Sequence, residues 1–252
     1  DYPDGVIDEK LPASGATLPP EWALQDPQDY LDVFFNTIPA VLKQSGVNPD
    51  EVVGIGVDFT ASSPMPVKSD GTPLSFLPEL KNNSHAYVKL WKHHASQPQA
   101  DKINAVARER GEWWLKRYGG KYSSEWFFSK LLQVLEEAPD VYDAIDVYIE
   151  AADWVIWQLT GVMTRNACTA GYKMLVQDGR YPSPEYFGAL DPRFKNVIAE
   201  KVAGSFAPLG GKAGGLTPEM AAKLGLKPGT AAAVANVDAH VTAPAVKATA
   251  PG

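Results

Sequence analysis

The 252-residue sequence has a single cysteine, Cys168, and no long hydrophobic run. One thiol excludes an internal disulfide and is typical of proteins in a reducing compartment. No stretch approaches the roughly 18 apolar residues that a membrane-spanning helix needs, and no basic segment followed by an apolar run suggests a signal peptide. We therefore expect a cytoplasmic protein with no membrane partner.

Positive charge is also scarce, because 23 Lys and Arg stand against 30 Asp and Glu and give a net charge of -7. Nucleic-acid surfaces need clustered Lys and Arg to neutralise phosphates. The densest basic patch lies at residues 89–94, and a solvated helix face explains it. No nucleic-acid partner is expected, and the composition points to small-molecule chemistry or to a scaffold.

Motifs for phosphate or metal binding are missing as well. No P-loop and no dinucleotide-binding glycine motif occurs, and the glycine-rich segment 210–215 lacks P-loop spacing, so we interpret it as a flexible turn. His93 and His94 are adjacent and cannot share a metal as an i, i+4 pair does. His240 has no Cys or His partner at ligand spacing. The residues therefore predict no metal site and leave any nucleotide-binding residues unknown.

The hydrophobic pattern predicts strands that alternate with helices, which indicates an α/β domain. The opening segment 1–25, rich in Pro and Gly, is expected to be irregular, and Asp70-Gly71 predicts a hairpin turn within 67–74. Pro39 is expected to kink or split the first helix. Helices are predicted at about 27–45, 86–95, 99–112, 124–138, 152–160 and 219–224, and buried strands at 52–58, 147–149 and 231–237.

Two of these strands, 52–58 and 231–237, end in turns that contain an aspartate. Ligands bind at the carboxyl ends of strands in open α/β sheets, so residues 58–61 and 236–240 are candidate site loops. Asp238 can accept a proton from a substrate hydroxyl. It can equally cap the helix that follows, and the residues alone favour the cap.

Other candidate site residues each have an ordinary structural interpretation. Ala61 lets a sugar approach the backbone and Thr60 offers a hydroxyl, but a plain strand-to-loop turn explains both. Trp91 and Trp126 can stack on a sugar, although aromatic residues at helical spacing usually belong to the core. Lys173 follows a run of small residues and can donate to a sugar hydroxyl, or it is a solvated surface lysine.

Five segments of the sequence agree, in their order and spacing, with motifs of one known family. They are Val53-Gly54-Ile55-Gly56-Val57-Asp58-Phe59-Thr60-Ala61, Leu90-Trp91-Lys92-His93-His94, Tyr118-Gly119-Gly120-Lys121-Tyr122-Ser123-Ser124-Glu125-Trp126, Cys168-Thr169-Ala170-Gly171-Tyr172-Lys173 and Asn236-Val237-Asp238-Ala239-His240. Together they resemble the FGGY carbohydrate kinases, and within that family the branch that phosphorylates L-ribulose. The resemblance covers essentially all 252 residues.

The resemblance implies a ribonuclease H-like (actin-like ATPase) α/β domain with helical insertions, in which residues 1–252 form the N-terminal, sugar-binding domain of a two-domain kinase. The family's opening Asp-x-Gly-Thr hairpin and its nucleotide domain do not occur in this sequence. The domain is therefore expected to be incomplete at its N-terminus and inactive alone. ATP and Mg²⁺ are the implied cofactors, bound largely outside these residues.

The implied reaction transfers the γ-phosphoryl group of ATP to the terminal hydroxyl of L-ribulose, giving L-ribulose 5-phosphate in L-arabinose catabolism. By resemblance, Asp238 is the general base, Ala61 and Lys173 contact the pentulose together with Asp238, and Glu125 and Trp126 line or support the pocket. The resemblance therefore favours Asp238 as a general base over Asp238 as a helix cap. A homodimer is compatible with the resemblance.

Three alternatives stay open. The first is another pentulose or polyol kinase of the same family, against which the Trp-Lys-His-His and Ser-Ser-Glu-Trp sequences argue. The second is a sugar-binding fragment without catalysis, which would have no need of Asp238 as a base. The third is an actin-like structural scaffold, which the match of the sugar loops disfavours.

Overall fold

The computed structural model describes residues 2–246. Its helices are α1 (Pro27–Ser45), α2 (Gln97–Arg110), α3 (Phe127–Glu137), α4 (Pro139–Ala144), α5 (Ala151–Thr160), α6 (Ala167–Lys173), α7 (Pro184–Leu190), α8 (Val197–Lys201), α9 (Pro218–Leu224) and α10 (Asp238–Ala245). Its strands are β1 (Leu24–Gln25), β2 (Gly54–Ile55), β3 (Asp58–Phe59), β4 (Pro64–Val67), β5 (Val88–Lys89), β6 (Val147–Glu150), β7 (Arg165–Asn166), β8 (Phe206–Ala207), β9 (Lys212–Gly215), β10 (Ala231–Ala233) and β11 (Asn236–Val237).

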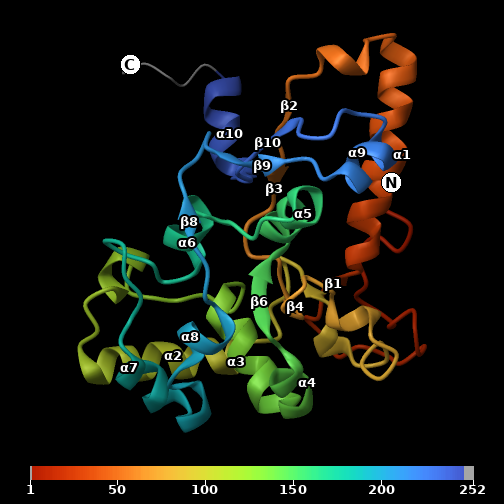
Figure 1. Cartoon of the computed structure of the whole chain (residues 1–252). Coiled ribbons are helices and arrows are strands. Elements are labelled where there is room, and N and C mark those ends of the chain that lie inside the picture. Colours follow the sequence, from red (N-terminus) through yellow and green to blue (C-terminus); the bar gives the residue numbers. More distant parts are fainter. Residues whose placement is uncertain (1, 247–252) are drawn as a thin grey trace.

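The elements gather into an upper part of strands and flanking helices and a lower, mainly helical part (Figure 1). In the upper part, β2, β10 and β9 lie beside α1 and α9, while α2, α3, α4, α7 and α8 form the lower part. Each part has its own cluster of buried hydrophobic side chains, one around Trp154 of α5 and one around Phe128 of α3. The antiparallel pair β4–β6 lies between them.

The parallel pairing of two chain segments far apart in sequence positions the site. β10 pairs with β2, with Ala231 opposite Gly54, and β11 pairs with β3, with Asn236 opposite Asp58. A Cβ at position 54 would lie 3.1 Å from the carbonyl oxygen of Ala231, so glycine permits this close approach. The carboxyl ends of β3 and β11, which carry the two candidate site loops, therefore lie side by side.

The predicted strands 52–58 and 231–237 are each interrupted. Between the two ladders, residues 56 and 57 lie opposite residues 233–235, so the second segment holds one extra residue. Such a bulge locally disrupts the ladder and bends the strand, and bulges are common next to active sites. The prediction that 52–58 is a buried strand is wrong, because Val53 is 90% exposed and the side chains of β2 and β3 are exposed or half-buried.

Several other predictions of local structure are confirmed. Helix α1 begins after Asp26, whose carboxylate accepts a hydrogen bond from the amide of Gln28, and ends at Gly46 with a φ of 67°. Such a left-handed residue is a common helix terminus. Helices α2, α3, α5 and α9 and strand β6 occur where the periodicity predicts them. The opening segment before α1 is mostly irregular, and the turn at Gly71 closes through a hydrogen bond from the Lys68 amide to the Thr72 carbonyl.

Two local predictions are wrong and a third is wrong in part. Pro39 does not split α1, which runs unbroken over Pro27–Ser45, while a kink at this proline stays a prediction. Residues 86–95 are not a helix, since they contain β5, which pairs antiparallel with β1 and buries its side chains. The segment 210–215 is not merely a turn, because β9 pairs with β10 there. Packing requires the glycines of β9, since a Cβ on Gly214 would lie 2.8 Å from Thr160 and one on Gly215 would lie 2.8 Å from Gly229.

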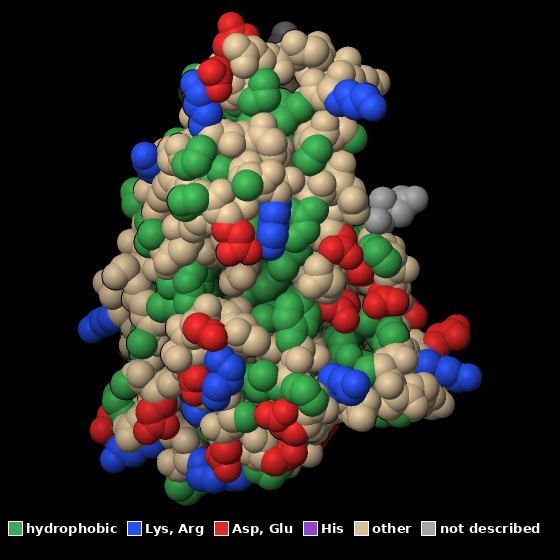
Figure 2. Space-filling view, turned by 45° about the vertical axis from the view of Figure 1, so that its right-hand side comes forward, with side chains coloured by type: hydrophobic (Ala, Val, Ile, Leu, Met, Phe, Trp, Pro, Cys, Tyr) green, Lys and Arg blue, Asp and Glu red, His purple; other side chains and the backbone are tan. Residues whose placement is uncertain are grey.

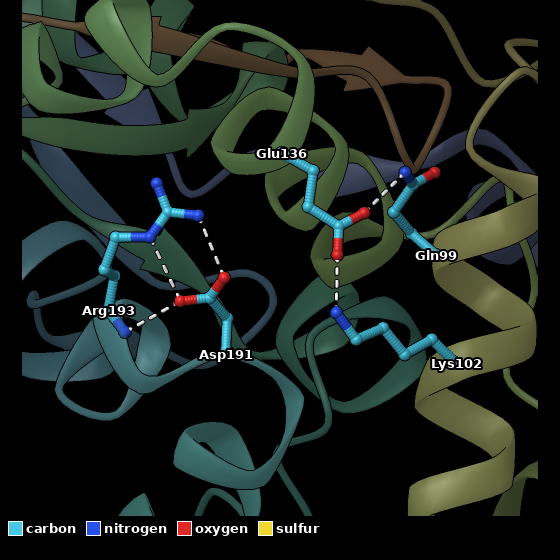
Figure 3. A network of polar contacts seen from close by, with 5 residues as sticks. All are labelled: Gln99, Lys102, Glu136, Asp191 and Arg193. Atoms are coloured by element: carbon cyan, nitrogen blue, oxygen red, sulfur yellow. Dashed lines mark hydrogen bonds and ion pairs between the residues drawn. The ribbon is translucent and has the colours of Figure 1, made fainter.

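Polar contacts between side chains join the helices of the lower part (Figure 3). Glu136 of α3 accepts a hydrogen bond from Gln99 at 2.8 Å and pairs with Lys102 at 2.6 Å, and both partners lie on α2. The neighbouring pair in the figure, Asp191 and Arg193, meets at 2.9 Å. Only the contacts of Glu136 link α2 with α3, since Asp191 and Arg193 lie two residues apart in one turn. Half-exposed ion pairs of this kind add little stability individually. Within residues 2–246 no helix is long and apolar enough to cross a membrane.

Replacement of Pro39 by alanine should stabilise the protein. Proline inside a helix removes one backbone hydrogen bond and strains the preceding turn, at a cost of roughly 3 kcal/mol relative to alanine. We expect Pro39→Ala to raise the free energy of unfolding in urea by up to about 3 kcal/mol. Lys43→Ala, at an exposed position of the same helix, should change it by less than about 0.5 kcal/mol. A gain no larger than that of the control would contradict the prediction.

Candidate functional site

A pocket of about 320 Å³ lies at the carboxyl ends of β3 and β11. It is formed by the loop after β3, the end of α6, the junction of β11 with α10, and two single side chains, one just after β5 and one just before α3. The lining residues are Thr60, Ala61, Ser62, Trp91, Glu125, Tyr172, Lys173, Val237, Asp238, Ala239 and His240. Most of the candidate site residues from the sequence are thus brought together, namely Thr60, Ala61, Trp91, Glu125, Lys173 and Asp238.

Asp238 is the first residue of α10 and is exposed to solvent at the edge of this pocket. Its Oδ1 accepts a hydrogen bond from the amide of Ala239 at 2.6 Å, and its carbonyl oxygen accepts one from Thr242 at 2.8 Å. Oδ1 bonds the amide of the next residue, which is not the bond to the second or third helical amide that an N-cap makes, so the cap stays a prediction. The contact engages only one of the two carboxylate oxygens, and the other can accept a proton.

Lys173 ends α6 and points over two aromatic rings. Its Nζ lies 4.7 Å from the ring centre of Trp126 and 5.3 Å from that of Tyr172. Partial burial lowers the pKa of Lys173, while the charges of Glu125 and Glu150 raise it. An ammonium held by ring faces in this way keeps its donors available to a ligand. Glu125 also lines this pocket, and its carboxylate lies 3.5 Å from the ring of His94.

Trp126 lines a second, adjoining pocket of about 620 Å³ instead of the first. It supports the first pocket from behind, through Lys173, and packs against the core around Phe128. Tyr172 borders both pockets. The wall between them also contains Cys168, whose Sγ lies 2.6 Å from Nδ1 of His240. Trp91 is 46% exposed and borders the first pocket, so it is not a core residue.

Two buried charged side chains lie directly beneath the pocket. Lys130 of α3 donates to the carbonyl oxygen of Ser62 at 2.6 Å, and Glu150 accepts from the amide of Ser63 at 2.9 Å. Burial lowers the pKa of Lys130 well below its usual value and raises the pKa of Glu150 to about 7. Sequence reasoning missed both residues. The sequence signal that could have revealed Lys130 is its place on the apolar face of a helix, three residues after Phe127 and four before Val134.

The residues of this pocket do not by themselves make a site for ATP or Mg²⁺. Among residues 2–246, no group of three or more His, Cys, Asp or Glu side chains is placed to hold a metal ion. The loops that line the pocket contain no glycine-rich phosphate cradle. On the face shown in Figure 2, basic and acidic side chains are interspersed around hydrophobic hollows rather than gathered by sign. The arrangement suits a small neutral polyhydroxylated ligand that meets two carboxylates, Glu125 and Asp238, and the ammonium of Lys173.

Comparisons with known proteins agree with this chemistry. Residues 8–244 match the model of the FGGY family of carbohydrate kinases, N-terminal domain. The chain is 55% identical over its whole length to a protein named ribulokinase from Geobacillus thermodenitrificans, of which it covers 45%, and 51% identical to one from Mycolicibacterium smegmatis, also over 45% of that protein. The chain thus spans about half the length of the curated relatives that it matches.

Solved structures show the same fold at low sequence identity. A xylulose kinase from Rhodospirillum rubrum has a TM-score of 0.72 at 18% identity over 94% of this chain and 46% of its own. A glycerol kinase from Plasmodium falciparum has a TM-score of 0.67 at 13% identity over 90% of this chain and 43% of its own. The expected actin-like fold of sugar kinases is confirmed. The chain belongs to the FGGY family of carbohydrate kinases and corresponds to its N-terminal domain.

Proposed function

We propose that the complete protein containing this chain is a kinase that transfers the γ-phosphoryl group of ATP to the terminal hydroxyl of L-ribulose. The observation that carries this proposal is the identity of 51–55% over the whole chain to several proteins named ribulokinase. The pocket supports it independently, since Asp238 and Lys173 meet there with Ala61 and Glu125. In this proposal residues 1–252 are the sugar-binding domain.

Asp238 would act as the general base. Its carboxylate lies at the mouth of the pocket, where a sugar hydroxyl can approach it, and Oδ1 is already oriented by the amide of Ala239. A carboxylate that accepts the hydroxyl proton makes the oxygen a better nucleophile toward phosphorus. Held at the N-terminus of α10, the anion is also stabilised by the helix dipole.

Lys173, Ala61 and Glu125 would bind the sugar. The ammonium of Lys173 donates hydrogen bonds, the carboxylate of Glu125 accepts them, and the small Ala61 leaves room for the carbon chain beside the backbone. Trp126 would act from behind, because its ring holds the ammonium of Lys173. Such a mixture of a few polar groups with apolar walls is typical of sites for small molecules.

ATP and Mg²⁺ belong to this proposal as cofactors held mainly by parts of the protein outside residues 1–252, so the chain alone should lack activity. The magnesium ion would neutralise charge on the phosphates.

A cytoplasmic location is also proposed, because Cys168 is a free thiol and free thiols persist in reducing compartments. A homodimer stays a prediction.

The rival function is a kinase for another pentulose or for a polyol, since the structural neighbours include proteins named xylulose kinase and glycerol kinase. Those neighbours are only 18% and 13% identical to this chain, so they bear on the fold and not on the sugar. A module that only binds sugar would leave the placement of Asp238 without a role.

The first test compares sugars. We expect the complete protein, with ATP and Mg²⁺, to show a kcat/KM for L-ribulose at least about tenfold above those for D-xylulose and glycerol, equivalent to roughly 1.4 kcal/mol of transition-state binding. ADP release measures it, with sugar omitted as the control. A preference for glycerol or D-xylulose would overturn L-ribulose as the substrate. The absence of turnover with all three compounds would overturn the proposal that the protein is a kinase.

The second test separates the base from the cap. Asn is as good an N-cap as Asp but cannot take the proton, so Asp238→Asn should lower kcat by roughly 10²–10⁴. Calorimetry should find the Kd for L-ribulose changed by less than about threefold. Asp32→Asn, on α1 and outside the pocket lining, serves as the control. Near-normal turnover of the Asp238 variant would leave that residue as a cap only.

The third test concerns Lys173. Lys173→Met keeps an unbranched side chain over the ring of Trp126 but removes a charged donor, a loss of about 1.5–3 kcal/mol. The Kd for L-ribulose should rise roughly ten- to hundredfold, with the KM for ATP unchanged. Lys116→Met, at an exposed position, is the matched control. Equal affinities of the two variants would return Lys173 to the role of a surface lysine.

A further inference from the structure

The buried ammonium of Lys130 contacts two separate segments that border the pocket. Its Nζ donates to the carbonyl oxygen of Ser62 at 2.6 Å, to that of Leu90 at 2.7 Å and to that of Lys89 at 3.3 Å. The first acceptor belongs to the loop 60–63 after β3, and the other two lead into Trp91. One cation thus joins two stretches of chain that are well separated in the sequence and line the same pocket.

The loop 60–63 needs such support because its backbone is strained. Ser62 has a φ of 70°, a left-handed conformation that non-glycine residues rarely adopt. Strained residues of this kind cost about 1–3 kcal/mol and persist only where the surroundings determine them strongly. Ser62 and Ser63 are buried, and the amide of Ser63 is held in turn by Glu150 at 2.9 Å.

The cost of burying Lys130 argues that its position has a purpose. Lys130 has no exposed surface, and the acceptors of its three hydrogen bonds are all backbone carbonyl oxygens rather than carboxylates. Among the described residues no carboxylate makes a direct ion pair with Lys130, although the charge of the buried Glu150 acts on it, and burying a charge in this way is expensive. An apolar residue of the same length would suit the core cluster that contains Phe127, Leu131 and Val134. What the ammonium adds is directionality, because three donors fix three acceptors.

We propose that Lys130 is a positioning residue for the sugar site, which clamps the loop 60–63 to the segment 89–91 so that Ala61 and Trp91 face the same ligand. This inference rests on the proposed function, since it takes the pocket to be the sugar site. Lys130 touches no ligand itself. It acts through the backbone of Ser62 and Leu90, and a shift of about 1 Å in such a site can cost roughly a hundredfold in rate.

The test replaces Lys130 by methionine in the complete protein. Lys130→Met keeps the length of the side chain but removes all three hydrogen bonds, so both segments lose their common anchor. We expect the Kd for L-ribulose to rise about ten- to hundredfold and kcat to fall, while the KM for ATP stays within about twofold. Lys130→Gln, which keeps two donors on a shorter side chain, should give an intermediate Kd.

Gln133→Met is the matched control for lost stability. Gln133 lies one turn further along α3, is equally buried, and contacts His93 and Glu137 rather than the loops of the pocket. It should lower the melting temperature while the Kd for L-ribulose stays within about twofold. The proposal is overturned if Lys130→Met binds the sugar as wild type does, or if Gln133→Met weakens binding equally for the same loss of melting temperature.

Amide hydrogen exchange on the wild-type protein decides the matter if the Lys130 variants do not fold. The segments 60–63 and 89–91 should open together, so peptides that cover them should show equal protection of their backbone amides against exchange. This should hold both without sugar and with it. Independent exchange of the two segments would overturn the clamp. If the wild type binds no pentulose or polyol, the proposed function fails, and the exchange measured without sugar still tests the clamp by itself.

Discussion

The parallel pairing of the segment 54–59 with the segment 231–237 is the constraint on which the site depends. The two segments are far apart in the sequence, so closing this contact costs more chain entropy than any local turn. The core of the upper part offsets that cost, since α5 contacts β3 and β10 as well as α1 and α9. Once the pairing forms, the carboxyl ends of β3 and β11 lie side by side, and Thr60 and Asp238 reach the same pocket. The chemistry is therefore assembled by tertiary structure.

Beneath that pairing, helix α3 and strands β5 and β6 supply buried charged groups that an apolar core does not need. Lys130 and Glu150 are both buried below the loop 60–63, and Lys89 lies 4.2 Å from the ring of Trp22, with burial lowering its pKa to about 7. Buried charges seldom add net stability. They do make the position of a backbone segment depend on a few directed contacts, which is what a site that must place a hydroxyl accurately requires. Stability and positioning are thus divided between the upper core and the buried charges.

The sequence predicted the parts of the fold that follow from local periodicity and capping. Asp26 and Gly46 delimit α1 as expected, and the alternation of strands and helices identified the α/β class. Prediction failed where tertiary contacts override local signals. Residues 88–89 form a strand because β1 is there to pair with them, and Gly214 is required by Thr160, which belongs to a distant helix. For the same reason the site was predicted only in part, because Ala61 and Asp238 follow recognisable strands, whereas Lys130 contacts its loops from a helix whose pattern shows only an oddly placed charge.

The exposure of the pocket bears on how the proposed reaction would exclude water. Asp238 is exposed, Trp91 is 46% exposed and Tyr172 is 56% exposed, whereas small-molecule sites usually bury most of their ligand. Phosphoryl transfer requires that the sugar hydroxyl, rather than water, reaches the phosphate. In the proposed function a further surface must therefore close over the sugar, and that surface is the one that binds ATP. Under the proposed clamp, Lys130 and the paired strands would already fix the sugar-binding half of the site, so closure would only have to bring the phosphoryl donor to the hydroxyl held there.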